Sequence, residues 1–166
     1  MGDKKMNARA AALIDQLQLS PHPEGGYYKE VYRSKDMVAS SDNGRMRNAV
    51  TDIYFLLLAD KPSCFHRGLH DEIWHYYEGA PLELIELQPE TLKSTKTVLG
   101  VKDGALRYKH CVQGGHWQAA RCLGDYSLVG CTVAPGFDFS DFKFLRDEEP
   151  ARLSVLRIHP ELSGLL

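Results

Sequence analysis

The sequence lacks several features that would place it in a large functional class. Its four cysteines, Cys64, Cys111, Cys122 and Cys131, form no Cys-x-x-Cys pair, which argues against a disulfide framework or a zinc ribbon and favours buried thiols. No apolar run approaches the roughly 20 residues of a membrane-spanning helix, and the N-terminus does not resemble a signal peptide. Lys and Arg form no cluster that would follow a phosphate backbone. We therefore expect a cytoplasmic protein that binds neither nucleic acid nor membrane.

The chain has the size and charge of one ordinary globular domain. It contains 166 residues, which is about the length of a single domain and is enough to bury a hydrophobic core without staples. The net charge of -2 and the 25% of charged residues suit a soluble protein with a small-molecule partner. We expect one domain over residues 1–166.

Short strands dominate the predicted secondary structure. Apolar residues recur at three- and four-residue steps only near the N-terminus, which predicts a helix over about residues 7–19 that Pro21 and Pro23 end. Segments rich in Val, Ile, Tyr, Trp and Leu then alternate with Gly, Pro and Asp, so we predict roughly nine strands. These segments are 27–33, 51–59, 72–77, 82–87, 96–99, 106–112, 117–123, 126–133 and 153–158. Strands without intervening helices favour an antiparallel sandwich or barrel.

Three remaining segments read as connections. Residues 137–146, with Ser140 as a candidate N-cap, and residues 160–165 predict short helices or turns near the C-terminus. Residues 36–48 are rich in Ser, Asp, Asn and Gly, which predicts a mobile loop with a possible role as a lid.

Residues that bind metals or move protons gather between Phe65 and Gly79. This stretch contains three of the seven histidines, His66, His70 and His75, together with Glu72. Imidazole and carboxylate groups can ligate a transition metal or transfer protons near neutral pH. Strict alternation along a strand would place Glu72 and His75 on opposite faces, so the two would share a site only across a bulge or a strand end.

Several longer motifs resemble one protein family. His66, Glu72 and Gly79 match parts of the first cupin motif, in which His-x-His precedes a Glu and then a Gly. The stretches 21–28 (PHPEGGYY), 71–75 (DEIWH), 114–120 (GGHWQAA) and 133–139 (VAPGFDF) resemble the DUF985, or Cupin_5, subfamily over nearly the whole chain. The resemblance implies an all-β, double-stranded β-helix or jelly-roll barrel of the sugar-epimerase-like kind over about residues 27–158. It also implies a homodimer, and the N-terminal helix and short C-terminal helical turns predicted above from the residue pattern complete the expected fold.

The departures from the cupin motifs bear on metal binding. The second histidine of the first motif would fall at position 68, where this chain has Gly68, and the Pro135-Gly136 turn of the second motif is followed by no histidine. A site made by His66, His70 and Glu72 would suit a divalent metal. We hold this as the weaker expectation and favour no cofactor.

A metal-free interpretation assigns proton transfer to the same residues. A carboxylate beside an imidazole favours the charged ring while burial opposes it, so the pair can titrate near neutral pH. We therefore predict His66, Glu72 and His75 as catalytic residues of an isomerase or epimerase that acts on a sugar phosphate or nucleotide sugar. A non-catalytic cupin that binds a nucleotide or sugar is the alternative, and a metal-dependent oxygenase is a weaker one.

Five further residues are candidates for substrate binding, each with a structural alternative. Arg33 could bind a phosphate or carboxylate bidentately, or could form a salt bridge that ties the first strand to the barrel. Gln118 could hydrogen-bond a sugar hydroxyl or lie within the sheet, and the sequence leaves open which tyrosine faces the interior. The full set is Glu24, Tyr28, Arg33, Tyr77 and Gln118.

Overall fold

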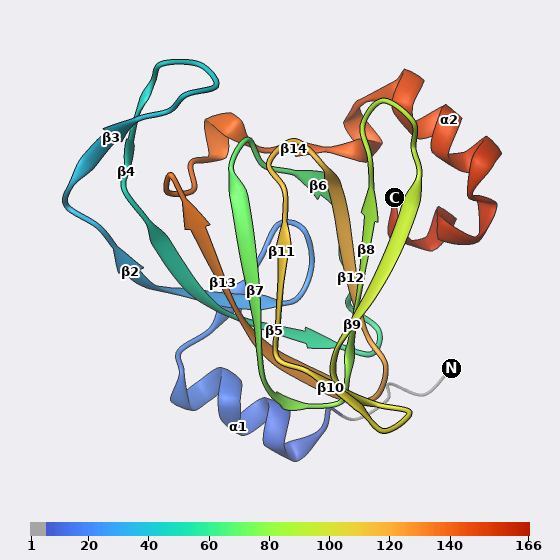
Figure 1. The fold of residues 1–166 in the computed structure, drawn as a ribbon. Helices are drawn as coiled ribbons and strands as arrows, with labels where there is room; N and C mark the ends of the chain where they lie inside the picture. The colour runs from blue at the N-terminus through green and yellow to red at the C-terminus, as the bar shows by residue number, and fades with distance from the viewer. Residues whose placement is uncertain (1–5) are drawn as a thin grey trace.

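The computed structural model describes residues 6–166 and shows two antiparallel sheets that face each other as a barrel (Figure 1). The first sheet has the order β1 (Ser20–Pro21), β2 (Tyr27–Arg33), β5 (Thr51–Leu58), β13 (Tyr126–Ala134), β7 (Asp71–Gly79) and β11 (Lys109–Val112). The second has the order β10 (Ala105–Arg107), β9 (Ser94–Lys102), β8 (Leu82–Leu87), β12 (Trp117–Cys122), β6 (Ser63–Arg67) and β14 (Lys143–Phe144). The all-β architecture expected from the sequence is confirmed.

Alternating apolar residues build the first sheet and anchor the N-terminal helix. Along β5, Phe55 and Leu57 point into the barrel core, whereas Leu56 and Leu58 pack on the outside. The outer pair meets α1 (Ala8–Gln16) through Ala10 and Leu13. The helix therefore covers the outer face of this sheet, below the barrel in Figure 1.

The central strand of the second sheet, β8, is buried on both faces. Along β8, Leu82 and Leu84 join the barrel core, while Ile85 and Leu87 point outward into a second cluster. That cluster is closed by α2 (Glu149–Ile158) and the 3₁₀ helix η3 (Pro160–Leu165). Two-sided burial explains why apolar residues of β8 point to both faces, and its two glutamates, Glu83 and Glu86, are themselves buried.

The predicted strand at 153–158 is wrong, because these residues lie in α2. Pro150 occupies the first turn of the helix, where its missing N–H costs nothing. Only Val155 is buried, while Leu153 and Ile158 are about half exposed, so one face of a helix packs on the sheet. The last strand is therefore β14, and the strands end well before the predicted residue 158.

Three other segments differ from the expectation. The predicted strand 106–112 is interrupted at Tyr108, and its halves β10 and β11 join different sheets. The short strand β6 between Pro62 and Gly68 was missed. The segment 36–48, expected as a loop, forms a two-stranded hairpin of β3 (Met37–Ala39) and β4 (Met46–Asn48), which projects from the barrel in Figure 1.

The C-terminal half of the chain also carries the expected short helical turns. Within 137–146 these are η1 (Phe139–Asp141) and η2 (Leu145–Asp147), and η3 coincides with the predicted 160–165. The cap of η1 is Asp138 and not Ser140, because the Asp138 carboxylate accepts the backbone N–H of Ser140 at 2.8 Å.

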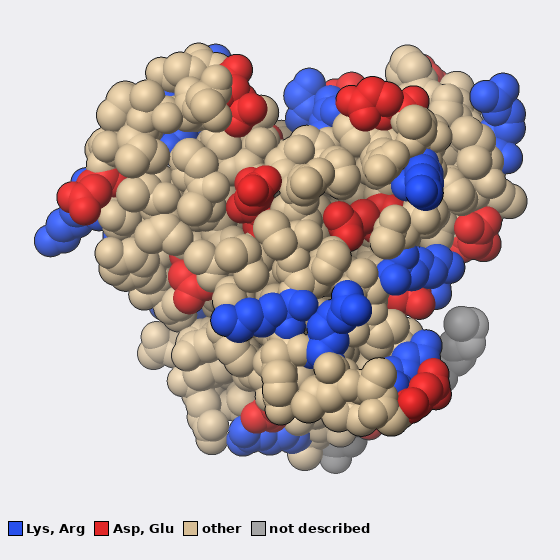
Figure 2. All heavy atoms as spheres, viewed as in Figure 1, with Lys and Arg blue, Asp and Glu red and all other residues tan. Residues whose placement is uncertain are grey.

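The surface shows no dominant charge on the face that Figure 2 draws. Acidic and basic side chains are mixed across it, in keeping with the small net charge of the chain. No helix within residues 6–166 is both long enough and apolar enough to cross a membrane.

Candidate active site

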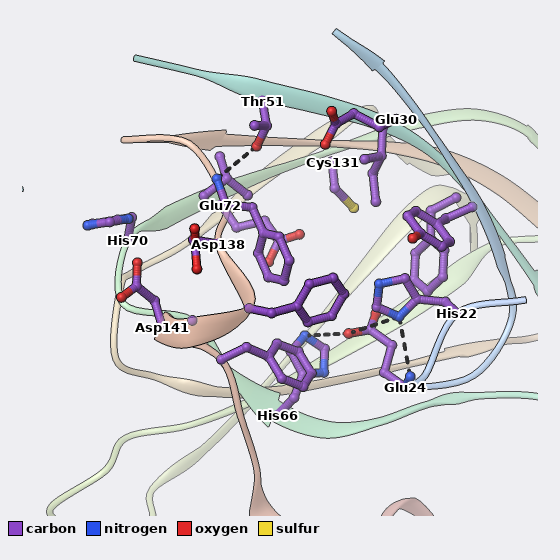
Figure 3. A pocket seen from close by; sticks show the side chains of 18 of the residues that line it. His22, Glu24, Glu30, Thr51, His66, His70, Glu72, Cys131, Asp138 and Asp141 are labelled. Atoms are coloured by element: carbon purple, nitrogen blue, oxygen red, sulfur yellow. Dashed lines mark hydrogen bonds and ion pairs between the residues drawn. The ribbon is translucent and has the colours of Figure 1, made fainter. Parts of the chain in front are cut away.

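A cavity of about 540 Å³ opens between the two sheets near one end of the barrel (Figure 3). Strands β2, β5, β7 and β13 contribute one wall, β6 contributes another, and the segment 137–142 closes part of the mouth. The ionisable lining residues that bear on its chemistry are His22, Glu24, His66 and Glu72, which lie among aromatic rings. The aromatic residues of the lining are Tyr28, Phe55, Phe137, Phe139 and Phe142.

His66 is held in one tautomer. Its Nδ1 lies 2.8 Å from the carbonyl oxygen of Cys64, and because a carbonyl only accepts, Nδ1 must carry the hydrogen. Nε2 is then the lone-pair nitrogen, and it lies 3.2 Å from Oε2 of Glu24. The ring stacks on Phe142 and is almost fully buried, and this burial lowers the pKa of His66.

Glu24 reaches His66 because the chain turns sharply after it. Gly25 has φ +117°, and a Cβ there would lie 2.0 Å from the carbonyl oxygen of Pro62, so only glycine permits this approach to β6. The hydroxyl of Ser63 donates to Oε1 of Glu24 at 3.0 Å. Burial raises the pKa of Glu24 to about 7, which keeps its carboxyl group largely protonated below neutral pH.

Glu72 enters the cavity from β7 as the second buried carboxyl group. The amide nitrogen of Gln118 donates to its Oε2 at 2.6 Å, and the Gln118 oxygen accepts the indole N–H of Trp74 at 2.9 Å. The thiol of Cys131 also contacts this carboxyl group. Burial raises the pKa of Glu72, and the nearby His66 partly opposes that rise. Gln118 therefore positions Glu72 from behind the cavity.

His22 is a cavity residue that the sequence interpretation did not select. Its Nδ1 accepts the backbone N–H of Glu24 at 3.2 Å, so in the neutral ring Nε2 carries the hydrogen. The ring meets Tyr28 edge-on with centroids 4.5 Å apart, and burial lowers the pKa of His22. The sequence could have indicated His22, because this residue lies in the family motif Pro-His-Pro-Glu-Gly-Gly at residues 21–26.

Arg33 lies at the mouth, but its guanidinium is fully used by the protein. Nε and Nη2 donate to the carboxylate of Glu30 at 3.0 and 2.8 Å, and Nη1 donates to Asn48 at 2.8 Å. Both terminal nitrogens also donate to the carbonyl of Phe137 at 3.2 Å. These bonds occupy all five N–H groups. The role is structural, but the ion pair with Glu30 lies within β2 itself, and the hydrogen bonds to Asn48 and Phe137 are what fasten the closing segment.

A buried arginine that the sequence analysis did not foresee, Arg47, fastens the same segment. Arg47 donates to both carboxylate oxygens of Asp141, at 2.7 and 2.8 Å, and to the hydroxyl of Ser140 at 3.0 Å. The sequence around Arg47 does not predict these contacts, because the partner residues lie 93 and 94 positions away along the chain.

His75 and Tyr77 lie outside the cavity. Residues 71–76 of β7 pair with β13 in regular register, so alternation turns both side chains to the face opposite Glu72. His75 Nε2 lies 3.0 Å from the hydroxyl of Thr132, which itself donates to Asp52. Tyr77 packs beside Tyr54. Of the tyrosines left open by the sequence, Tyr28 is the one that lines the cavity.

The three residues considered as metal ligands do not converge. His70 turns its Nε2 to the hydroxyl of Ser40 at 2.8 Å, whereas His66 faces Glu24. Within residues 6–166 no group of three or more His, Cys, Asp or Glu side chains is placed to hold a metal ion. With glycine at position 68 as well, the residues present do not fit the metal centre of metal-binding cupins, and we derive no step through a metal.

Comparison with known proteins decides the family. The family model described as "Cupin superfamily (DUF985)" matches residues 11–145. The chain belongs to the DUF985 family of cupins. The uncharacterized protein YML079W of Saccharomyces cerevisiae is 34% identical to this DUF985 cupin over 153 residues, covering 82% of this chain and 75% of the yeast protein.

Solved structures agree with the assignment. A hypothetical protein from Leishmania major and protein SO0799 from Shewanella oneidensis are each 33% identical to this DUF985 cupin, with TM-scores of 0.79 and 0.78. Each match covers 94% of this chain and 96% of the other. Oxalate decarboxylase from Bacillus subtilis, at 15% identity and a TM-score of 0.57 over 88% of this chain and 36% of its own, shares the cupin fold alone.

Proposed function

We propose that this DUF985 cupin is an isomerase or epimerase that moves a proton on a small sugar derivative inside the barrel. The observation that carries the proposal is the cluster of Glu24, His66 and Glu72. Burial raises the pKa of both carboxyl groups, that of Glu24 to about 7, and lowers the pKa of the imidazole, so the acids and the base of the cluster approach each other in proton affinity. Groups with pKa values near the working pH are the efficient acids and bases.

The contacts suggest a division of roles within the cluster. His66 Nε2 is engaged by Glu24, whose raised pKa leaves the shared proton on the carboxyl oxygen. Glu72 lies apart from this pair across the aromatic centre of the cavity (Figure 3). Glu72 would remove a proton from the carbon beside a carbonyl, and the Glu24–His66 pair would return one. This arrangement of two proton-exchanging groups suits delivery to a neighbouring carbon or to the opposite face.

The electrons released in this step stay within the substrate. The C–H bond breaks, its electron pair moves to the carbonyl oxygen as an enolate, and reprotonation at the same carbon restores the carbonyl. For reprotonation at the neighbouring carbon, the proton of the adjacent hydroxyl also moves to the first oxygen, so neither reaction needs an oxidant or reductant. The hydroxyl of Tyr28 and the Nε2–H of His22 are the donors available to stabilise the oxyanion, because both residues line the cavity. The surrounding phenylalanines supply apolar surface on which a sugar ring can stack.

Hydrogen–deuterium exchange tests the proposal without knowledge of the natural substrate. A panel of sugar phosphates, nucleotide sugars and free sugars is incubated with the protein in deuterated water, and NMR follows the hydrogen on the carbon beside the carbonyl. We expect exchange with at least one member, lowered about 100-fold or more in Glu72→Gln because the base is lost. His75→Gln is the matched control, since His75 lies on the same strand but faces away from the cavity.

The same panel separates catalysis from simple binding. Ligands that shift protein resonances at the cavity but show no exchange under any condition would sink the isomerase proposal. That result would favour the alternative, a cupin that only binds a nucleotide or sugar.

A further inference from the structure

A second hollow, which we call the vestibule, adjoins the cavity at its rim. Its volume is about 550 Å³, and it shares Gly68, Leu69 and Asp141 with the lining of the cavity. Three basic side chains line it: Arg45, Arg67 and Lys143. The carboxylate of Asp141 is already paired with Arg47, so it does not neutralise them. The vestibule thus carries an excess of positive charge.

Arg67 is held in place but its donors are unused. The guanidinium lies over the ring of Trp117, with its central carbon 4.4 Å from the ring centroid. In the part of the chain that the structure describes, none of its five N–H groups has a hydrogen-bond acceptor from the protein, in contrast to Arg33 and Arg47. A guanidinium fixed by an aromatic face with free donors is prearranged for an anion.

The pairing of β6 with β14 places a second cation beside it. Arg67 and Lys143 are direct partners across the two antiparallel strands, so their side chains leave the sheet on the same face. Like charges directly opposite each other destabilise a sheet. Glu148 contacts Lys143 at 3.2 Å, but no protein carboxylate contacts Arg67 within residues 6–166. An anion between the two cations would remove the repulsion.

Gly68 leaves the rim open between the two hollows. It lines both of them, and a Cβ built on it would meet no atom within 4 Å. The position at which the cupin motif has a histidine is therefore a gap here. His66 and Arg67 are consecutive on β6 and point to opposite faces of the strand, so a ligand that reaches both would cross the shared rim at Gly68, Leu69 and Asp141.

We propose that Arg67, with Lys143 and Arg45, forms a subsite for the phosphate group of a ligand whose remaining part occupies the cavity. A phosphate accepts the paired donors of a guanidinium and the point charge of a lysine together. The inference deepens the proposed function, on which it rests for the reacting part of the ligand. It assigns to Arg67 the phosphate contact that the sequence interpretation considered for Arg33.

Binding of inorganic phosphate tests the subsite directly, by phosphorus NMR or calorimetry. We expect saturable binding to the unaltered protein, weakened about tenfold or more in Arg67→Met, because a charged hydrogen-bonded contact is lost. Methionine keeps an unbranched apolar chain over Trp117, and near-ultraviolet circular dichroism checks that the fold is retained. Arg107→Met is the control, since Arg107 is exposed on β10 in the second sheet and does not line the vestibule. No saturable binding, or equal binding by Arg67→Met, overturns the proposal.

Two further comparisons keep this proposal distinct from the proposed function. Glu72→Gln should bind phosphate as well as the unaltered protein does, because Glu72 lies in the cavity and not in the vestibule. If a sugar phosphate undergoes exchange, Arg67→Met should raise its KM while leaving the KM of the dephosphorylated sugar unchanged. Phosphate binding through Arg67 without any exchange would retain the subsite and reject the isomerase proposal. Exchange whose KM does not change in Arg67→Met would retain the isomerase proposal and reject the subsite.

Discussion

Replacing Glu24 by glutamine should make the protein more stable at mildly alkaline pH. Burial raises the pKa of Glu24 from its ordinary value of 4.5 to about 7, so the folded protein favours the protonated carboxyl group. The stabilisation that the bound proton supplies is fully present below about pH 4.5 and is lost as the pH rises through about 7. Glutamine imitates the protonated form at every pH and retains a donor for His66.

The magnitude follows from the pKa difference between the unfolded and folded states. It corresponds to at most about 3 kcal/mol of unfolding free energy above neutral pH. An ionised Glu24 recovers part of this by attracting a protonated His66 at a contact of 3.2 Å, which is why the figure is an upper bound. The buried histidines change stability in the opposite direction, and their coupling to the Glu24 charge, which is absent in Glu24→Gln, further reduces the difference between the two proteins.

Urea unfolding of the two proteins between about pH 5 and pH 8 measures the effect. Their unfolding free energies should nearly coincide at the acid end and diverge as the pH rises, with Glu24→Gln the more stable. Glu90→Gln, at an exposed position, controls for the loss of a carboxylate as such. Parallel curves for Glu24→Gln and the unaltered protein would refute the reasoning that burial holds Glu24 protonated.

Three further predictions concern the support of the cavity. Gln118→Leu should cost about 1–3 kcal/mol of unfolding free energy and should also slow exchange, because Glu72 loses its amide donor; normal exchange would show that this bond is dispensable. Arg47→Met should lower the melting temperature clearly more than Arg9→Met, since Arg47 is buried where Arg9 is exposed, and equal shifts would contradict this. His75→Gln should leave exchange unchanged, and a large loss there would restore His75 as a catalytic residue.

The barrel was predictable because its strands carry a local signal. Runs of apolar and aromatic residues along β5 and β13, bounded by turn residues, are visible in the sequence itself. The sequence of residues 153–158 does not distinguish a strand from a helix, because a short apolar run is compatible with both. Tertiary packing of Val155 against the second sheet decided in favour of α2.

The candidate site was only partly predictable, for a different reason. The cupin-like spacing pointed to His66 and Glu72, and both line the cavity. Their decisive partners come from distant segments: Gln118 reaches Glu72 across 46 residues, and Glu24 reaches His66 through the turn at Gly25. Such contacts depend on strand register and turn geometry, which the local motif does not contain.

Arg33 shows at a single residue how sequence alone cannot predict which partners a side chain contacts. The sequence could not choose between an anion-binding arginine and a structural one, because both need the same side chain. The structure distinguishes the two roles by the hydrogen bonds of each guanidinium group. The N–H groups of Arg33 all bond to the protein, whereas those of Arg67 do not. The residue that the sequence passed over is therefore the better candidate for a phosphate.

The most direct test of the central claim is an NMR titration of the cavity cluster in the unaltered protein. Carboxyl carbon resonances of Glu24 and Glu72 and ring nitrogen resonances of His66 are followed with pH. We expect Glu24 to titrate near pH 7, Glu72 above its ordinary range, and His66 to keep its hydrogen on Nδ1 in the neutral ring. Carboxyl groups that titrate at the ordinary value of about 4.5, or a neutral His66 protonated on Nε2, would contradict the account.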